Sequence, residues 1–132
     1  RAQVLTHDLR RQPLASPVVY PGSVERTSWA EREETKAYAI LALKAAARRW
    51  VLEWSPLPAR DMIDVRVGPS PGRETLEAEL QNHLHRVPSD AVVRVHLRGG
   101  WSRGAEMALS AANLRRLAPS TMNISLHRPA SR

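Results

Sequence analysis

Histidine spacing in two places resembles the spacing of metal-binding motifs. His83 and His85 lie in a stretch with helical periodicity, and helical residues two apart point roughly 200° away from each other. The two side chains therefore cannot share one ion, and we interpret them as surface histidines at a helix end. His7 and Asp8 lie beside a predicted strand end, where such a pair is more often structural than liganding. We assign no catalytic residue and no metal ligand to this chain.

The chain carries a formal net charge of +7, and 18 of its 20 basic residues are arginines. Basic side chains that neutralise phosphates supply most of the sequence-independent affinity of proteins for DNA. The charge therefore favours an anionic partner, but a GC-rich genome would produce the same arginine excess, and both explanations stay open. Cysteine is absent, which excludes a disulfide framework and a thiolate zinc site. Because no signal peptide and no apolar run of membrane-span length is present, we expect a cytoplasmic protein without membrane contact.

The stretch from Pro21 to Lys36 combines turn residues with dense charge. Gly22 permits a backbone turn that is closed to other residues, and Ser23 can hydrogen-bond the loop that follows. Arg26 offers a rigid five-donor fork for a carboxylate or a phosphate. The nearby acidic residues favour a structural role for this arginine over a contact with DNA. They are Glu31, Glu33 and Glu34.

Residues 1–60 read mostly as strands. Short strands are predicted over Gln3–Thr6 and Pro17–Tyr20, and a strand with apolar residues on both sides is predicted over 37–43, as in the interior of a sandwich. A hairpin through 44–49 leads to a strand with Trp50, Leu52 and Trp54 on one face. The alternative for the three alanines 45–47 is a helical turn. Pro56 and Pro58 are expected to end the strand and mark a domain boundary.

Residues 61–132 follow the pattern strand, helix, strand, helix, strand. The first helix is predicted to start with Ser70 as N-cap and Pro71 at its first position, and to end before Pro88. Its apolar residues recur at helical spacing: Leu76, Leu80, Leu84 and Val87. The second is predicted to place Met107, Ala111, Leu114 and Ala118 on one apolar side. Trp29 and Trp101 lie in predicted loops, where core packing is expected and stacking on a frayed DNA end is the alternative.

Alternation in the three predicted strands gives the small domain one apolar and one polar sheet face. If both helices cover the apolar face, right-handed crossovers require the parallel strands to follow chain order. The opposite face would then collect Asp64, Arg66, Arg94, His96, Arg98, Asn123, Ser125 and His127. This face is either an ordinary solvated surface or a surface that contacts DNA or a neighbouring domain. The candidate DNA-binding residues are Arg26, Arg66, Arg94 and Arg98.

Three motifs occur together in a specific order: Gln3-Val4-Leu5-Thr6-His7-Asp8-Leu9, then Pro21-Gly22-Ser23-Val24-Glu25-Arg26 with an acidic stretch and a lysine, then the segment from Trp50 to Arg60. In this order they resemble the SbcD-type nuclease subunits, DNA double-strand-break repair exonucleases built on a calcineurin-like metallophosphoesterase. The resemblance implies an α+β chain: residues 1–60 form the closing strands of the phosphoesterase β-sandwich, and residues 61–132 form a small βαβαβ capping domain.

The resemblance also implies an activity and partners. The family holds two divalent ions, usually manganese, through ligands that end in Gly-His-x-His and would lie just before Arg1, so this chain would carry none of them. The chain is expected to be the C-terminal part of the nuclease subunit of an SbcCD-like complex, inactive alone, with double-stranded DNA ends as substrate. A homodimer of the nuclease subunit and an SbcC-type ATPase subunit are the implied partners.

Two other functions are compatible with the sequence. One is a noncatalytic α+β module that binds nucleic acid or protein through its cationic sheet. The other is a phosphoesterase that acts on small substrates, which the fold alone does not separate from a nuclease.

Overall fold

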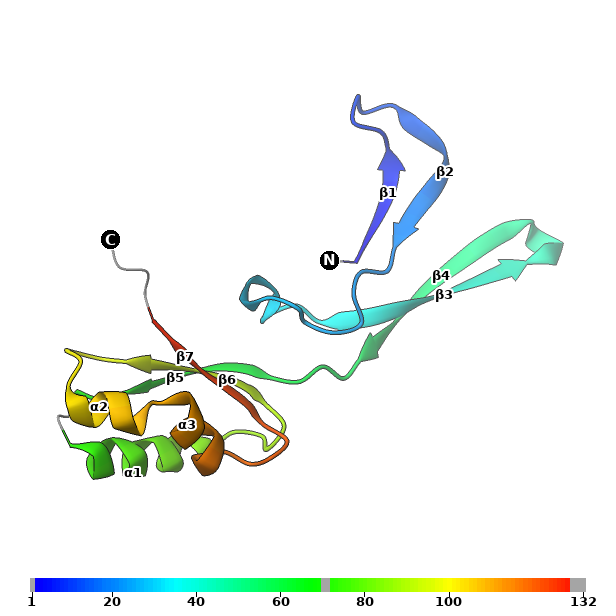
Figure 1. The fold of residues 1–132 in the computed structure, drawn as a ribbon. Helices are drawn as coiled ribbons and strands as arrows, with labels where there is room; N and C mark the ends of the chain where they lie inside the picture. The colour runs from blue at the N-terminus through cyan, green and yellow to red at the C-terminus, as the bar shows by residue number, and fades with distance from the viewer. Residues whose placement is uncertain (1, 70–71, 129–132) are drawn as a thin grey trace. The chain divides into compact units, whose positions relative to one another are not determined.

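The computed structural model describes residues 2–69 and 72–128. Over these residues the protein is an α+β chain with seven strands in three small sheets and three α-helices (Figure 1). The chain divides into two compact units, Arg1–Ala59 and Arg60–Arg132. We refer to them as the N-terminal unit and the C-terminal unit.

The N-terminal unit begins with an antiparallel pair, β1 (Gln3–His7) and β2 (Pro13–Tyr20). Both predicted strands are confirmed, but β2 starts at Pro13 rather than at Pro17. In a two-stranded sheet every strand is an edge, so a proline can occupy an outward-facing position without breaking the ladder. The connecting turn is closed by Asp8, whose Oδ1 accepts hydrogen bonds from the backbone N–H groups of Arg10 and Gln12, both at 2.8 Å.

A longer hairpin follows, formed by β3 (Lys36–Lys44) and β4 (Arg49–Leu57). Its tip is the 3-10 turn η2 (Ala45–Ala47), so the predicted hairpin contains the helical turn that the alanines allowed. The prediction that Pro56 ends the strand is wrong, because Pro56 lies within β4, where it pairs with Ala37. The reason is again that both strands of a two-stranded sheet are edges.

The register of this hairpin separates an apolar face from a mixed face. The cross-strand pairs on the apolar face are Leu43 with Trp50, Leu41 with Leu52, and Ala39 with Trp54. We call these six residues the apolar hairpin face. On the other face Ile40 lies opposite Glu53 and Lys44 lies opposite Arg49. The sequence predicted the face shared by the two tryptophans, but the expectation of burial on both sides of β3 is wrong for this chain.

The apolar residues of the N-terminal unit lie mostly at its surface. Among the described residues, every buried apolar side chain belongs to the C-terminal unit. Of the exposed large apolar residues, all but Trp101 and Met107 belong to the N-terminal unit. The two hairpins thus have their strand pairing but no hydrophobic core of their own within the described residues.

The C-terminal unit contains the parallel sheet β5 (Met62–Val67), β6 (Val92–Leu97) and β7 (Asn123–His127) in that order. The predicted strand order is therefore confirmed. In Figure 1 the three helices lie on the same side of this sheet. Val65, Val67, Val93 and Val95 alternate toward them and form the centre of the hydrophobic core.

The first helix, α1 (Arg73–Leu84), buries Leu76, Leu80 and Leu84, as the helical spacing predicted. Gly72 is its N-cap residue. The predicted cap at Ser70 and Pro71 lies outside the described residues. The next connection leads to β6 through Pro88, whose carbonyl accepts a hydrogen bond from Ala91 at 3.1 Å.

The predicted single second helix is two short helices, α2 (Arg103–Ala108) and α3 (Ala111–Leu117). Ser110 separates them, because its hydroxyl accepts a hydrogen bond from the backbone N–H of Asn113 and so caps α3. This break shifts the buried face, and the prediction for Met107 and Ala111 is wrong. Both are exposed. The residues that face the core are Ala105, Ala108, Leu109, Asn113 and Leu114.

Candidate nucleic-acid interface

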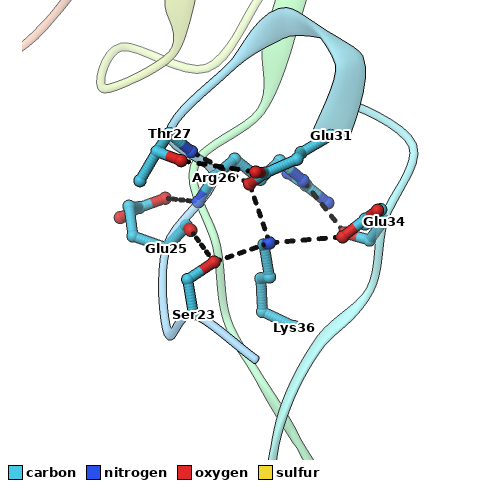
Figure 2. A network of polar contacts seen from close by, with 7 residues as sticks. All are labelled: Ser23, Glu25, Arg26, Thr27, Glu31, Glu34 and Lys36. Carbon is cyan, nitrogen blue, oxygen red and sulfur yellow. Dashed lines mark hydrogen bonds and ion pairs between the residues drawn. The ribbon is translucent and has the colours of Figure 1, made fainter. Parts of the chain in front are cut away.

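Lys36 lies at the centre of a polar network in the N-terminal unit (Figure 2). Its side chain is only 4% exposed. The ammonium Nζ donates hydrogen bonds to Ser23 Oγ at 2.9 Å, to Glu31 Oε2 at 2.9 Å and to Glu34 Oε2 at 3.3 Å. These three acceptors match the three donors of an ammonium group. A lysine at the first residue of β3 thus ties together three points of the preceding loop.

Arg26 forms further hydrogen bonds within the same loop. Its Nε donates to the main-chain oxygen of Glu34 at 3.0 Å, and its backbone N–H donates to Glu25 Oε1 at 3.2 Å. Glu31 also accepts from the backbone of Thr27 at 3.1 Å. Glu34 is one of the acidic residues that the sequence offered as a partner for Arg26, so the contacts fit the structural role. DNA contact by Arg26 stays a prediction.

The charges of the network stabilise one another. The hydrogen bond from Lys36 is the main reason that the pKa of Glu31 is lowered, and the bond from Thr27 adds to it. The hydrogen bond to Glu31 raises the pKa of Lys36. Both groups therefore stay charged at neutral pH, and the loop is closed by ion pairs.

The open face of the C-terminal sheet carries a second polar cluster. Arg94 holds Asp64 with two hydrogen bonds, Nε to Oδ1 at 2.7 Å and Nη2 to Oδ2 at 3.2 Å. His96 Nε2 lies 2.7 Å from the same Oδ1, and donates to it because an ionised carboxylate only accepts. The rings of His96 and His127 have centroids 4.7 Å apart. Parallel register places these residues side by side on β5, β6 and β7.

Asp64 is strongly stabilised in its ionised form. The hydrogen bonds from Arg94 are the largest cause, and the contact with His96 adds to them, so that the pKa falls from 3.8 to about 2 despite burial. Its side chain is 14% exposed. The carboxylate therefore neutralises part of the positive charge of this face over the whole physiological pH range.

A lowered pKa in the folded state predicts a loss of stability in acid. Asp64 stabilises the fold fully above the unfolded pKa of 3.8, and this contribution is lost as the pH falls through the folded pKa of about 2. A shift of this size corresponds to about 2 kcal/mol, which solvent screening on an open face reduces to about 1 kcal/mol.

This prediction can be checked by urea unfolding at about pH 6 and about pH 2. We expect Asp64→Asn to lose about 1 kcal/mol relative to the native chain at the higher pH and only a small fraction of this at the lower pH, where the carboxylate is about half protonated. The exposed residue Asp61 provides the control through Asp61→Asn. A difference between Asp64→Asn and the native chain that is the same at both pH values would contradict the ion pair.

Two of the four predicted DNA-binding arginines lie on the open face of the C-terminal sheet. Arg66 and Arg94 share the open face through the β5–β6 register. Arg66 is exposed, and no described residue forms an ion pair with it, whereas Arg94 is engaged with Asp64. The placement of Arg98 on this face is wrong, because its guanidinium reaches Glu79 of α1, on the helix side, at 3.5 Å. Arg26 belongs to the other unit.

The three histidines that the sequence analysis considered as metal ligands lie at the ends of a helix or a strand. His83 is in the last turn of α1 and His85 is its C-cap residue, while His7 ends β1 and contacts Thr6 Oγ1 through Nδ1 at 2.9 Å. Within residues 2–69 and 72–128, no group of three or more His, Cys, Asp or Glu side chains is arranged to hold a metal ion. None of the helices in that part of the chain has the length and apolar character that crossing a membrane requires.

The burial of two residues, Trp101 and Lys36, differs from what the sequence indicated. Trp101 does not pack in the core, since it is 43% exposed in the loop between β6 and α2. Lys36 was recognised only as the end of a motif and not as a buried partner. Its position directly after an acidic stretch, at the start of a strand, was the available signal.

Comparison with models of known protein families and with curated proteins found no match for this chain.

Proposed function

We propose that this chain is the C-terminal portion of an SbcD-like nuclease subunit, a metal-dependent exonuclease that acts on DNA double-strand ends in repair and recombination. The N-terminal unit supplies closing strands of the metallophosphoesterase sandwich. The C-terminal unit is the capping domain that helps to position DNA. The complete protein acts in the cytoplasm as a homodimer with an SbcC-type ATPase subunit.

The apolar hairpin face is the observation that carries this proposal. Leu41, Leu43 and Trp50 are more than half exposed although they alternate like core residues. An apolar groove of about 390 Å³ extends from this face to the first hairpin, where Val4 and Val19 line it. Two sheets that pack face to face form a sandwich by covering such surfaces. We therefore infer that these two hairpins are the last strands of a β-sandwich and that residues outside this chain form the sheet that covers their apolar face.

The Lys36 network supports the same proposal from a second direction. The segment from Pro21 to Arg26 carries the resemblance to SbcD-type subunits, and it forms a closed loop instead of a free linker. Ser23, Glu31 and Glu34 all bind the lysine that ends the motif. Residues of the motif and of the acidic stretch that follows it thus form the hydrogen bonds that close the loop.

The role of this chain in catalysis is indirect. The two divalent ions would activate water and stabilise the in-line displacement at a phosphodiester. The resemblance puts the ligands of these ions in the region before Arg1, so the proposal assigns the ions to residues outside this chain. What this chain contributes is the sandwich edge, the closed loop and the cap.

The proposal predicts a complete difference in activity between the chain and the whole protein. Residues 1–132 should not hydrolyse linear duplex DNA with manganese, whereas the gene product that includes the preceding region should. That region should encode an Asp-x-His, an Asn-His pair and a Gly-His-x-His directly before Arg1. Hydrolysis by residues 1–132, or a reading frame without these ligands, would overturn the proposal.

Arg66 offers the cleanest test of a DNA-binding role for the open sheet face. Replacing Arg66 with glutamate in the complete protein should weaken duplex binding uniformly across sequences and reduce the salt slope by about 1. Arg94→Glu is less informative, because it would place a second carboxylate against Asp64. Exposed Arg86, in the turn after α1, is the matched control. Unchanged affinity and unchanged slope in Arg66→Glu would make the face an ordinary solvated surface.

The runner-up is a noncatalytic nucleic-acid or protein-binding α+β module. The observation that favours it is the location of all the buried apolar side chains among the described residues in the C-terminal unit. The same experiments separate the two functions. DNA binding that depends on Arg66, in a protein without the predicted metal ligands, would support the module.

A further inference from the structure

The loop that leaves β6 interleaves arginine, glycine and an aromatic residue. It reads Arg98-Gly99-Gly100-Trp101-Ser102-Arg103. Its shape is set by contacts rather than left free. Gly99 has φ +86°, and a Cβ at this position would lie 2.9 Å from Pro69 Cβ. At the other end the Ser102 hydroxyl accepts a hydrogen bond from Ala105 at 3.1 Å and caps α2. The loop therefore presents Trp101 in a defined position.

Trp101 is held at the surface, away from the core. It is the only tryptophan of the C-terminal unit, and the hydrophobic cluster of that unit does not include it. The guanidinium of Arg128 lies 5.0 Å from the ring centroid. The parallel register explains this contact: His96 pairs with His127, so the end of β7 runs beside the loop that follows β6. One side of the indole is thus covered by a cation and the rest stays accessible.

The charge around the indole is positive. Arg98 precedes Trp101 in the loop, Arg103 follows it as the first residue of α2, and Arg128 lies over the ring. Glu79 pairs with Arg98 at 3.5 Å, a contact between half-exposed groups that contributes little. Proteins bind single-stranded nucleic acid by stacking bases on aromatic side chains beside cations that contact the backbone. Arginine layered on an aromatic ring adds to this stacking.

We propose that Trp101 and Arg128 form a stacking site for an unpaired nucleobase, with Arg98 and Arg103 contacting the adjoining phosphates. The base lies on the part of the indole that Arg128 leaves exposed. The identification of the ligand as the frayed strand of a DNA end rests on the proposed function, but the stacking itself does not. The loop is open at Gly100, because a Cβ placed there would meet no heavy atom within 4 Å apart from Gly100 and its two chain neighbours.

Fluorescence anisotropy of residues 1–132 with a labelled oligothymidylate and with a blunt duplex of equal length tests this site. Trp101→Ala should weaken binding of the single strand about tenfold and leave duplex binding unchanged, since one stacked base is removed. Trp101→Phe should restore most of the affinity because it keeps an aromatic face. Met107→Ala, at another exposed apolar residue, should bind like the native chain. Far-UV circular dichroism verifies that each variant is folded.

Equal single-strand binding by Trp101→Ala and the native chain would overturn the site, and so would equal losses for single strand and duplex. The outcome is distinguishable from failure of the proposed function, because neither metal nor catalysis is involved. If Trp101-dependent binding is found in a protein whose complete form has no nuclease activity, the stacking site stands and the proposed function fails. Tighter Trp101-dependent binding of oligouridylate than of oligothymidylate would also keep the site but replace the DNA end by RNA.

Discussion

Replacement of Leu80 by alanine is expected to lower the free energy of unfolding of the C-terminal unit by about 2–5 kcal/mol. Leu80 is fully buried on α1 and belongs to the cluster that joins the helices to the sheet. The truncation removes the transfer free energy of the lost carbons and leaves a cavity beneath the helix. Small domains hold only about 0.05–0.15 kcal/mol of stability per residue, so this unit should come close to unfolding at room temperature.

Urea titration followed by far-UV circular dichroism measures this effect. Met107→Ala is the matched control, because Met107 is a large apolar residue of the same helical layer that is 46% exposed. Its expected change is within about 0.5 kcal/mol. A similar loss in both variants would mean that the core does not lie between α1 and the sheet as described.

Gly99→Ala is expected to destabilise the C-terminal unit by about 1–3 kcal/mol. Gly99 has φ +86°, a conformation that residues with a side chain rarely adopt. The added Cβ would also lie 2.9 Å from Pro69 Cβ, a ring carbon that cannot rotate away. Backbone strain and the contact therefore act in the same direction.

Gly100 provides an internal control next to this position. A Cβ on Gly100 meets nothing within 4 Å, and Gly100 is not among the positive-φ glycines. Gly100→Ala should thus change the free energy of unfolding by less than about 0.5 kcal/mol. Thermal melts of the two variants give the comparison directly. Equal melting temperatures would contradict the conformation of the loop that presents Trp101.

Secondary structure was predictable where one period governed a whole segment. The strands β5, β6 and β7 and the buried leucines of α1 follow simple alternation or helical spacing. The prediction failed for Met107 and Ala111, because the segment is two helices with different buried faces and Ser110 caps the second one. A serine between two helical stretches reads equally well as an exposed helical residue, and only the hydrogen bond to Asn113 decides between the two.

The residues of the candidate sites were harder to predict than the secondary structure, because their environment depends on tertiary contacts. Arg66, Arg94 and Arg98 alternate along two strands and were placed on one face. The structure leaves Arg66 exposed, engages Arg94 with Asp64 and turns Arg98 toward Glu79 on the helix side. How firmly a cation is held therefore depends on the acidic residues within reach, which come from positions far away in the sequence: Asp64 holds Arg94 closely, whereas the contact of Arg98 with Glu79 is between more exposed groups and contributes little.

The sequence by itself predicted the alternation of the parallel strands, their order once both helices cover one face, and the face shared by Trp50, Leu52 and Trp54, because periodicity and crossover handedness are local or chiral properties of the chain. Tertiary structure decided that Lys36 is buried among three oxygen acceptors and that Trp101 stays at the surface beneath Arg128. The physical reason is that burial and ion pairing are properties of groups brought together by folding. Residue type and spacing specify which groups can pair, and the fold selects the pairs that form.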